Sequence, residues 1–199
     1  NVKETDLAGN TSNATTNFAV TGDTTAPTAN FTAATDNVGT VTGALTSGNT
    51  TDDTALVLSG TNESGSSVKV FNGSTELGAA NVSGTSWSYS ATVANGTTYQ
   101  FNVKETDLAG NTSNATTNFV VTGDTTPPTV SSVVIASAAG IQNDFLNADD
   151  NVSVTATFSE SVIVDNASGT PELNLVVGSY SREATYASGD NSTTLVFQY

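Results

Sequence analysis

Acidic and amide side chains are concentrated in segments of this sequence that are expected to be loops. The pentapeptide Asp-Leu-Ala-Gly-Asn occurs twice, at residues 6–10 and 107–111, and further acids lie in the phrases TDNVG at 35–39 and TTDD at 50–53. Calcium prefers about six to eight hard oxygen ligands, which carboxylates, Asn amides and turn carbonyls supply. Carboxylates within about 6 Å of one another repel unless a cation neutralises them. The pattern therefore indicates structural Ca²⁺ sites.

A second interpretation of the same residues is purely local. The side chain of Asp or Asn commonly caps a turn by accepting a backbone N–H two residues along the chain. The aspartates in DNVG, DLAGN and GDTT all occupy positions where that role is expected. The two interpretations are compatible for any single residue, because a carboxylate that caps a turn still has lone pairs for a cation.

Composition excludes several classes of function. Among 199 residues there are 4 Lys and Arg against 19 Asp and Glu, a formal net charge of -15, and there is no Cys, His or Met. A disulfide framework, a zinc site, a thiol nucleophile and a histidine base are therefore ruled out, and we assign no catalytic residue. Four basic residues cannot form a phosphate-tracking patch, so neither nucleic acid nor an anionic membrane is expected as a partner.

The apolar residues alternate with polar ones, which predicts antiparallel strands with one buried face. Pairs at a spacing of two are Leu56 and Leu58, Val68 and Val70, Trp87 and Tyr89, Phe101 and Val103, and Phe119 and Val121. Asn-Gly at 72–73 and 95–96 predicts tight turns. No window has helical periodicity, so the expected fold is all-β, and Trp87 is expected to fill a sandwich core.

An internal duplication predicts the domain organisation. Residues 1–27 recur at 102–128, with Ala19 replaced by Val120 and Ala26 by Pro127. A period of about 100 residues is typical of tandem sandwich domains. We therefore expect residues 1–22 to be the last two strands of one domain, 23–123 to be a complete domain, and 124–199 to be a second type of domain, truncated at its C-terminal end. The chain is then an excerpt from a longer polypeptide; the alternative is that residues 1–22 complete the truncated domain of a neighbouring chain.

Several phrases resemble a known family. They are GDTTAPT at 22–28, TDNVGTVTGALTSGNTTDDTALVLSGTNESGSSVKVFNG at 35–73, the strand that contains Trp87, and TDLAGNTS at 106–113. Together they resemble the bacterial immunoglobulin-like tandem repeats in the extender regions of giant RTX-type surface adhesins. Residues 128–199, with the phrase ASAAGIQNDFLNADDNVSVTATFSESV at 136–162, resemble a second Ig-like repeat of such proteins less specifically. The resemblance implies secretion to the bacterial cell surface, a role in adhesion or biofilm formation, neighbouring repeats as partners, and calcium that stiffens the domain junctions.

Ig-like topology sorts the acids by the end of the sandwich at which they are expected. The residues expected at the entry end of the middle domain are Asp23, Glu63, Glu105, Asp107 and Asn111. Those expected at its exit end are Asp36, Asp52, Asp53 and Asp124. The corresponding candidates in the neighbouring domains are Asp6, Asn10, Asp149, Asp150 and Glu160.

Two other functions fit the sequence. The chain could be a subunit of an extracellular filament or surface layer, built by lateral contact or strand exchange between repeats. It could also be a binding module that recognises a glycan or a protein, for which exposed loop aromatics would be the sign, and Phe31, Phe145 and Tyr180 are the candidates. The leading hypothesis remains a calcium-rigidified structural extender without chemistry of its own.

Overall fold

The computed structural model describes residues 1–139, 151–177 and 179–199, and within them every regular element is a β-strand. This confirms the all-β prediction. The chain divides into two compact units, residues 1–125 and 126–199, which are treated separately below. None of the described segments forms a helix of the length and hydrophobicity that crossing a bilayer requires.

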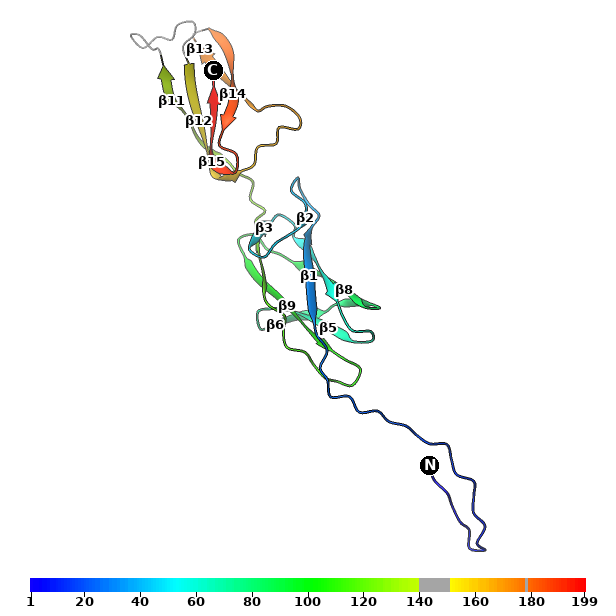
Figure 1. Cartoon of the computed structure of the whole chain (residues 1–199). Helices are drawn as coiled ribbons and strands as arrows, with labels where there is room; N and C mark the ends of the chain where they lie inside the picture. The colour runs from blue at the N-terminus through cyan, green and yellow to red at the C-terminus, as the bar shows by residue number, and fades with distance from the viewer. Residues whose placement is uncertain (140–150, 178) are drawn as a thin grey trace. The chain divides into compact units, whose positions relative to one another are not determined.

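The body of the first unit is a sandwich of two five-stranded sheets (Figure 1). The first sheet has the order β2-β1-β4-β8-β7, with β2 at Gly43–Ala44, β1 at Asn30–Asp36, β4 at Ala55–Thr61, β8 at Ser86–Thr92 and β7 at Asn81–Ser83. The second has the order β3-β10-β9-β5-β6, with β3 at Asn49–Thr51, β10 at Phe119–Gly123, β9 at Thr98–Thr106, β5 at Ser67–Asn72 and β6 at Thr75–Ala79. All pairs are antiparallel except β3 with β10, which is parallel.

The core of this sandwich consists of the alternating apolar residues of the sequence. Leu56 and Leu58 of β4, Val70 of β5 and Phe101 of β9 have no exposed surface, and they pack in one cluster. Their neighbours in β4 and β5 are more exposed, and they include polar Ser59 and Lys69 as well as apolar Val57 and Phe71. The predicted strand faces are therefore confirmed.

Trp87 lies in this core, with 2% of its surface exposed. Its indole N–H donates to the carbonyl of Asn30 at 3.0 Å, and its ring contacts Phe31 edge-on at 5.8 Å. Gly60 lies beneath the indole, where a Cβ would come within 2.6 Å of the Trp87 Nε1. Trp87 thus has the predicted core role, and the Phe31 ring is also packed, stacked on Phe119 at 5.2 Å.

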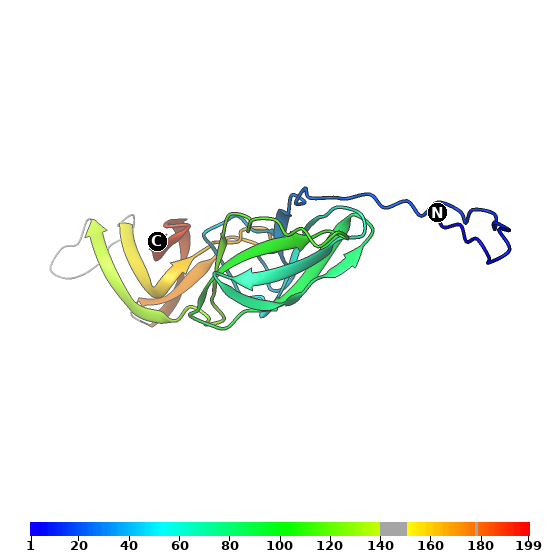
Figure 2. The ribbon, with the colours of Figure 1, turned by 90° about the horizontal axis from the view of Figure 1, so that it is seen from below.

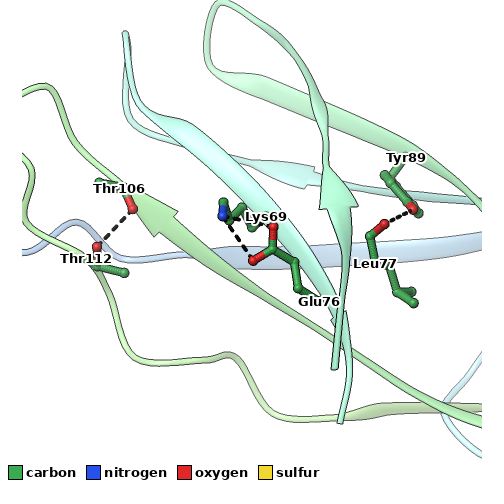
Figure 3. A network of polar contacts seen from close by, with 6 residues as sticks. All are labelled: Lys69, Glu76, Leu77, Tyr89, Thr106 and Thr112. Carbon is green, nitrogen blue, oxygen red and sulfur yellow. Dashed lines mark hydrogen bonds and ion pairs between the residues drawn. The ribbon is translucent and has the colours of Figure 1, made fainter. Parts of the chain in front are cut away.

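The two Asn-Gly turns occur where the sequence predicts them. Asn72-Gly73 joins β5 to β6, and Gly73 has φ +57°, in the left-handed region that favours glycine. On the outer side of this hairpin, the exposed Lys69 and Glu76 form an ion pair at 2.9 Å (Figure 3). From β8 of the other sheet, the Tyr89 hydroxyl donates to the Leu77 carbonyl of β6. Asn95-Gly96 lies between β8 and β9, and Gly96 has φ +69°.

Residues 1–22 differ from the expectation of two strands. They contain only an isolated bridge between Thr5 and Thr11, and every one of them is exposed. Strands need partners for their backbone groups and a surface on which to bury their apolar face. Backbone hydrogen bonds join its two arms, from the Ser12 N–H to the Glu4 carbonyl at 2.8 Å and from the Thr15 N–H to the Val2 carbonyl at 3.0 Å, but its apolar side chains stay exposed.

The second unit contains one five-stranded antiparallel sheet (Figures 1 and 2). Its order is β11-β12-β15-β14-β13, with β11 at Val130–Ala139, β12 at Asn151–Val162, β15 at Ser192–Gln198, β14 at Tyr180–Ser188 and β13 at Glu172–Val177. Ala156, Ala184, Leu195 and Phe197 form its buried cluster. Tyr180 is 65% exposed, and Phe145 lies outside the described residues.

Candidate metal centre

The loop between β9 and β10 is built around the carboxylate of Asp107. Its Oδ1 accepts the backbone N–H groups of Ala109 at 2.9 Å and Asn111 at 2.8 Å, and its Oδ2 accepts the Asn111 side-chain amide at 2.8 Å. Gly110 has φ +94°, which closes the turn. The Asn111 side-chain hydrogen bond, followed by the backbone N–H groups, holds the pKa of Asp107 below its ordinary value. The residue therefore performs the turn-capping role.

Hydrogen bonds join the two sides of this loop at its base. The hydroxyls of Thr106 and Thr112 lie 2.9 Å apart (Figure 3), and the Glu105 backbone N–H donates to the Ser113 hydroxyl at 2.9 Å. These contacts fix where the Asp107 carboxylate is presented at the end of the sandwich.

A cavity of about 390 Å³ brings together three of the predicted entry-end acids. Asp23 of the linker, Glu63 of the β4–β5 loop and Asp107 all line it, together with Leu108. The Asn111 amide donates to the Asp23 carbonyl at 3.2 Å, so the linker is in contact with the β9–β10 loop. Oxygens from three separate segments of the chain therefore face one space.

Glu105 is in contact with the Glu63 backbone and has no exposed surface. Its Oε1 accepts the Glu63 backbone N–H and the Ser66 hydroxyl, both at 2.5 Å. Its Oε2 has no hydrogen-bond partner, and neither has the Oδ1 of Asn62, which is 7% exposed. The structure thus contains two buried oxygen acceptors without donors at this end of the sandwich.

Asn62 and Ser66 are absent from the sequence-based set of site residues. The phrase Asn-Glu-Ser-Gly-Ser at 62–66 contains several oxygen-bearing side chains, but its spacing does not reveal which of them turn inward. The structure shows that Asn62 and Ser66 are buried whereas Glu63 is exposed. Asn62 donates to the Glu63 carbonyl at 2.8 Å, which orients that loop.

At the exit end, each of the two buried aspartates accepts two hydrogen bonds within its own turn. Asp36 accepts the Val38 N–H at 3.0 Å and the Thr51 hydroxyl at 2.6 Å. Asp53 accepts the N–H groups of Ala55 at 2.8 Å and Asn37 at 3.3 Å. Both residues act as turn caps between β1, β3 and β4.

The other predicted site residues are dispersed. Asp52 is exposed next to Gly39, and the Asp124 N–H donates to the Thr51 carbonyl at 2.8 Å. Asp6 and Asn10 form the same loop as Asp107 and Asn111, but with every residue exposed. In the second unit, Glu160 lies in β12, half-buried, and the predicted ligands Asp149 and Asp150 lie outside the described residues.

Across the described ranges, no three Asp or Glu side chains converge closely enough to hold a metal ion. At the entry cavity the carboxylates line one space, but they are not close enough together to form a cluster of metal ligands. The lining nevertheless suits a hard cation, because it offers the carboxylates of Asp23, Glu63 and Asp107 together with hydroxyl oxygens.

The comparisons with known proteins identify the sandwich. A family model described as a bacterial Ig-like domain matches residues 26–125, which include both of its sheets and the β9–β10 loop. No curated protein and no solved structure matches the sequence. The matched segment covers half of the chain, and its topology is the antiparallel sandwich described above. The chain therefore belongs to the family of bacterial Ig-like domains.

Proposed function

We propose that this chain is a structural extender segment of a large secreted bacterial adhesin, and that Ca²⁺ bound at the entry cavity rigidifies it. Bacterial Ig-like domains are commonly surface-associated or extracellular, and an acidic chain without catalytic groups suits a load-bearing spacer. The segment holds a more distant adhesive domain away from the cell, in cell adhesion or biofilm formation.

The observation that carries the proposal is the entry cavity. Its lining includes the linker residue Asp23 and the loop residues Glu63 and Asp107. A cation in this space would tie the linker to both loops and would remove the repulsion among the carboxylates. Since such an ion binds the folded arrangement and not the unfolded chain, it would also raise the stability of the unit by mass action.

Calcium dependence of unfolding tests this function. The fluorescence of Trp87, the single Trp of the chain, reports the unfolding of the first unit alone. With free Ca²⁺ about 100-fold above its Kd, the unfolding free energy should rise by about 3 kcal/mol over its value in chelator. Asp107→Asn should abolish most of this rise, whereas the matched change Asp6→Asn, in the exposed copy of the loop, should leave it intact.

Overlapping melting curves with calcium and with chelator would contradict the ion-clamped extender. The stiffness of the linker is a separate readout. Spin labels placed on the two sides of residue 23 should give a narrower distance distribution in calcium than in chelator, and Asp23→Asn should broaden it.

A further inference from the structure

Strand β11 of the second unit has one edge that the described part of the chain leaves open. It pairs with β12 on one side, and none of the other described strands pairs with it on the second side. All residues from Val130 to Ser137 are exposed. A free strand edge presents a row of unpaired N–H and C=O groups, to which another extended strand can hydrogen-bond. The open edge of β11 is therefore available for pairing.

The other strands that end a sheet are protected against such pairing. Strands β2, β3 and β7 have only two or three residues each. Strand β6 carries Glu76, which is ion-paired with Lys69. Strand β13 begins with Glu172, and Glu183 lies in the neighbouring β14. Short length and charged side chains both discourage pairing at a sheet edge.

The central part of β11 has neither kind of protection. The strand is ten residues long and uncharged, and the whole stretch 125–143 contains no charged residue in a chain of net charge -15. The register with β12 shifts between Val130 and Ser132 and again between Ile135 and Ser137, but residues 132–135 pair with β12 without interruption. This central segment is therefore a regular, uncharged edge.

The central segment also exposes apolar side chains on both faces of the sheet. Val133 is 48% exposed and Ile135 is 68% exposed, and the register places them on the same face as the buried Ala156 and Val154 of β12. Val134 is 52% exposed and lies on the opposite face. A strand added at this edge would therefore cover apolar surface on both faces in addition to pairing the free backbone groups.

A second copy of β11 fits this edge. Because the segment is uncharged, two copies of an acidic chain can meet here without like charges at the contact. Directly opposite residues of an antiparallel pair share a face, so a two-fold axis between two identical strands passes through a residue. An axis at Val134 sets all three apolar side chains against apolar ones. Val134 then lies opposite Val134 of the partner subunit, and Val133 lies opposite Ile135 of the partner subunit.

We propose that the open edge of β11 is a self-association surface, at which two copies of this chain pair antiparallel about Val134. The contact is isologous, so it closes at two copies and does not propagate into a filament. It goes beyond the extender role and is independent of calcium, since none of the candidate metal ligands lies in residues 125–143. Two paired edges bury less area than the roughly 1,200 Å² at which stable interfaces begin, so a Kd of about 0.1 mM is expected.

Sedimentation equilibrium of the full chain in chelator tests the pairing. Between about 10 µM and about 1 mM, the unsubstituted chain should pass from monomer to dimer. Val134→Lys places two like charges opposite each other at the axis and should raise the Kd at least about tenfold. The matched control is Val176→Lys, because Val176 is an exposed Val on β13, the other edge strand of the sheet, and this variant should dimerise like the unsubstituted chain. A chain that stays monomeric throughout, or a dimer that Val134→Lys leaves intact, would overturn the proposal.

Disulfide cross-linking provides a second measurement, which does not depend on how well the Lys variant folds. The chain has no Cys, so Val134→Cys introduces a single thiol. In the proposed pair the two Cα atoms at this position lie about 4.5–5.5 Å apart, within the range that a disulfide bridges. Mild oxidation at a chain concentration near the Kd should therefore give a covalent dimer, whereas Val176→Cys should remain largely monomeric. Equal dimer yields from the two variants, or no dimer from Val134→Cys, would contradict pairing at β11.

Discussion

Residues 1–22 and 102–123 have nearly the same sequence but different structures, and the difference separates local from long-range causes. The two copies differ only at Ala19 and Val120. In the second copy the flanking residues belong to β9 and β10 of the sandwich, whereas in the first copy they have no sheet partners. The turn in the middle is the same in both.

The turn is the same because its contacts lie within five residues. Asp6 Oδ1 accepts the N–H groups of Ala8 at 2.9 Å and Asn10 at 2.8 Å, the same distances that Asp107 shows. Gly9 has φ +89° where Gly110 has φ +94°. A carboxylate, an amide and one glycine are enough to close this loop without a surrounding core.

The strands differ because their stability depends on burial. Val121 has no exposed surface, while its counterpart Val20 is 80% exposed. Identical residues thus contribute to a core in one copy and remain in water in the other. This makes the first copy an internal control for substitutions in the second.

The largest difference between the copies is expected for an apolar truncation. Val121→Ala should reduce the unfolding free energy of the first unit by about 2–3 kcal/mol, because it removes buried methyl groups and leaves a cavity. Val20→Ala should change it by less than about 0.5 kcal/mol. Urea unfolding followed by Trp87 fluorescence measures both; a similar loss in both variants would mean that residues 1–22 are also packed in solution.

The next largest effect on stability is expected for the hydrogen bond between the Glu105 N–H and the Ser113 hydroxyl at the base of the loop. Ser113→Ala should cost about 1–2 kcal/mol, because it leaves the buried Glu105 N–H without an acceptor. Ser12 accepts the Glu4 N–H in the same way at 3.0 Å, but in an exposed segment where water can replace it. Ser12→Ala should therefore leave the urea midpoint unchanged, and a shift there would argue that the first copy contributes to the fold.

Glycine replacement tests whether the loop conformation is coupled to the sandwich. Gly110→Ala creates no steric clash, since no atom lies within 4 Å of the new Cβ, but it places Ala at φ +94°. The expected cost to the first unit is about 1 kcal/mol. Gly9→Ala should open its own loop, seen as faster exchange of the Asn10 amide, without a change in the melting temperature of the unit.

The smallest effect is the acid titration of the two loops. Hydrogen bonds from the Asn side chain lower the pKa of both Asp6 and Asp107. A lowered folded-state pKa means that the loop's stability is fully present above about pH 4 and is lost as the pH falls through the lowered value. NMR titration of the two carboxyl carbons should give closely similar curves, and a clear separation would show that the sandwich alters the Asp107 loop.

Period-two alternation predicted the sandwich well, because the buried residues of β4, β5 and β8 follow it; β9 departs from it only at Asn102, which is buried between Phe101 and Val103. Strand formation also depends on a partner: residues 1–22 carry the same alternation as β9 and β10 and yet remain exposed, and their assignment to a preceding domain stays a prediction. No pattern within a segment reports whether a second sheet is available to cover it.

The candidate site was predictable only in part. Its loop acids Asp107 and Glu63 are recognisable from turn sequences, and Asp23 from the linker. The burial of Asn62 and Glu105 depends on which face of the chain meets the core near the ends of β4 and β9. The sequence does not show this, and only the structure does. The exit-end acids Asp36 and Asp53 were predicted as ligands in the same way; the structure shows that they cap turns, and their role as ligands stays a prediction.

The parallel pairing of β3 with β10 has a consequence for a domain under tension. β3 lies in the early part of the sandwich and β10 ends it, with Val121 to Gly123 aligned beside Asn49 to Thr51. Tension on the two ends of the domain reaches β3 only after β1 and β2 have detached from their sheet. From that point it pulls β3 and β10 past each other along their length, so that the hydrogen bonds between them are loaded together and not one at a time. Resistance to force is governed by the rate of crossing that barrier, and it can therefore be high even in a domain of modest equilibrium stability.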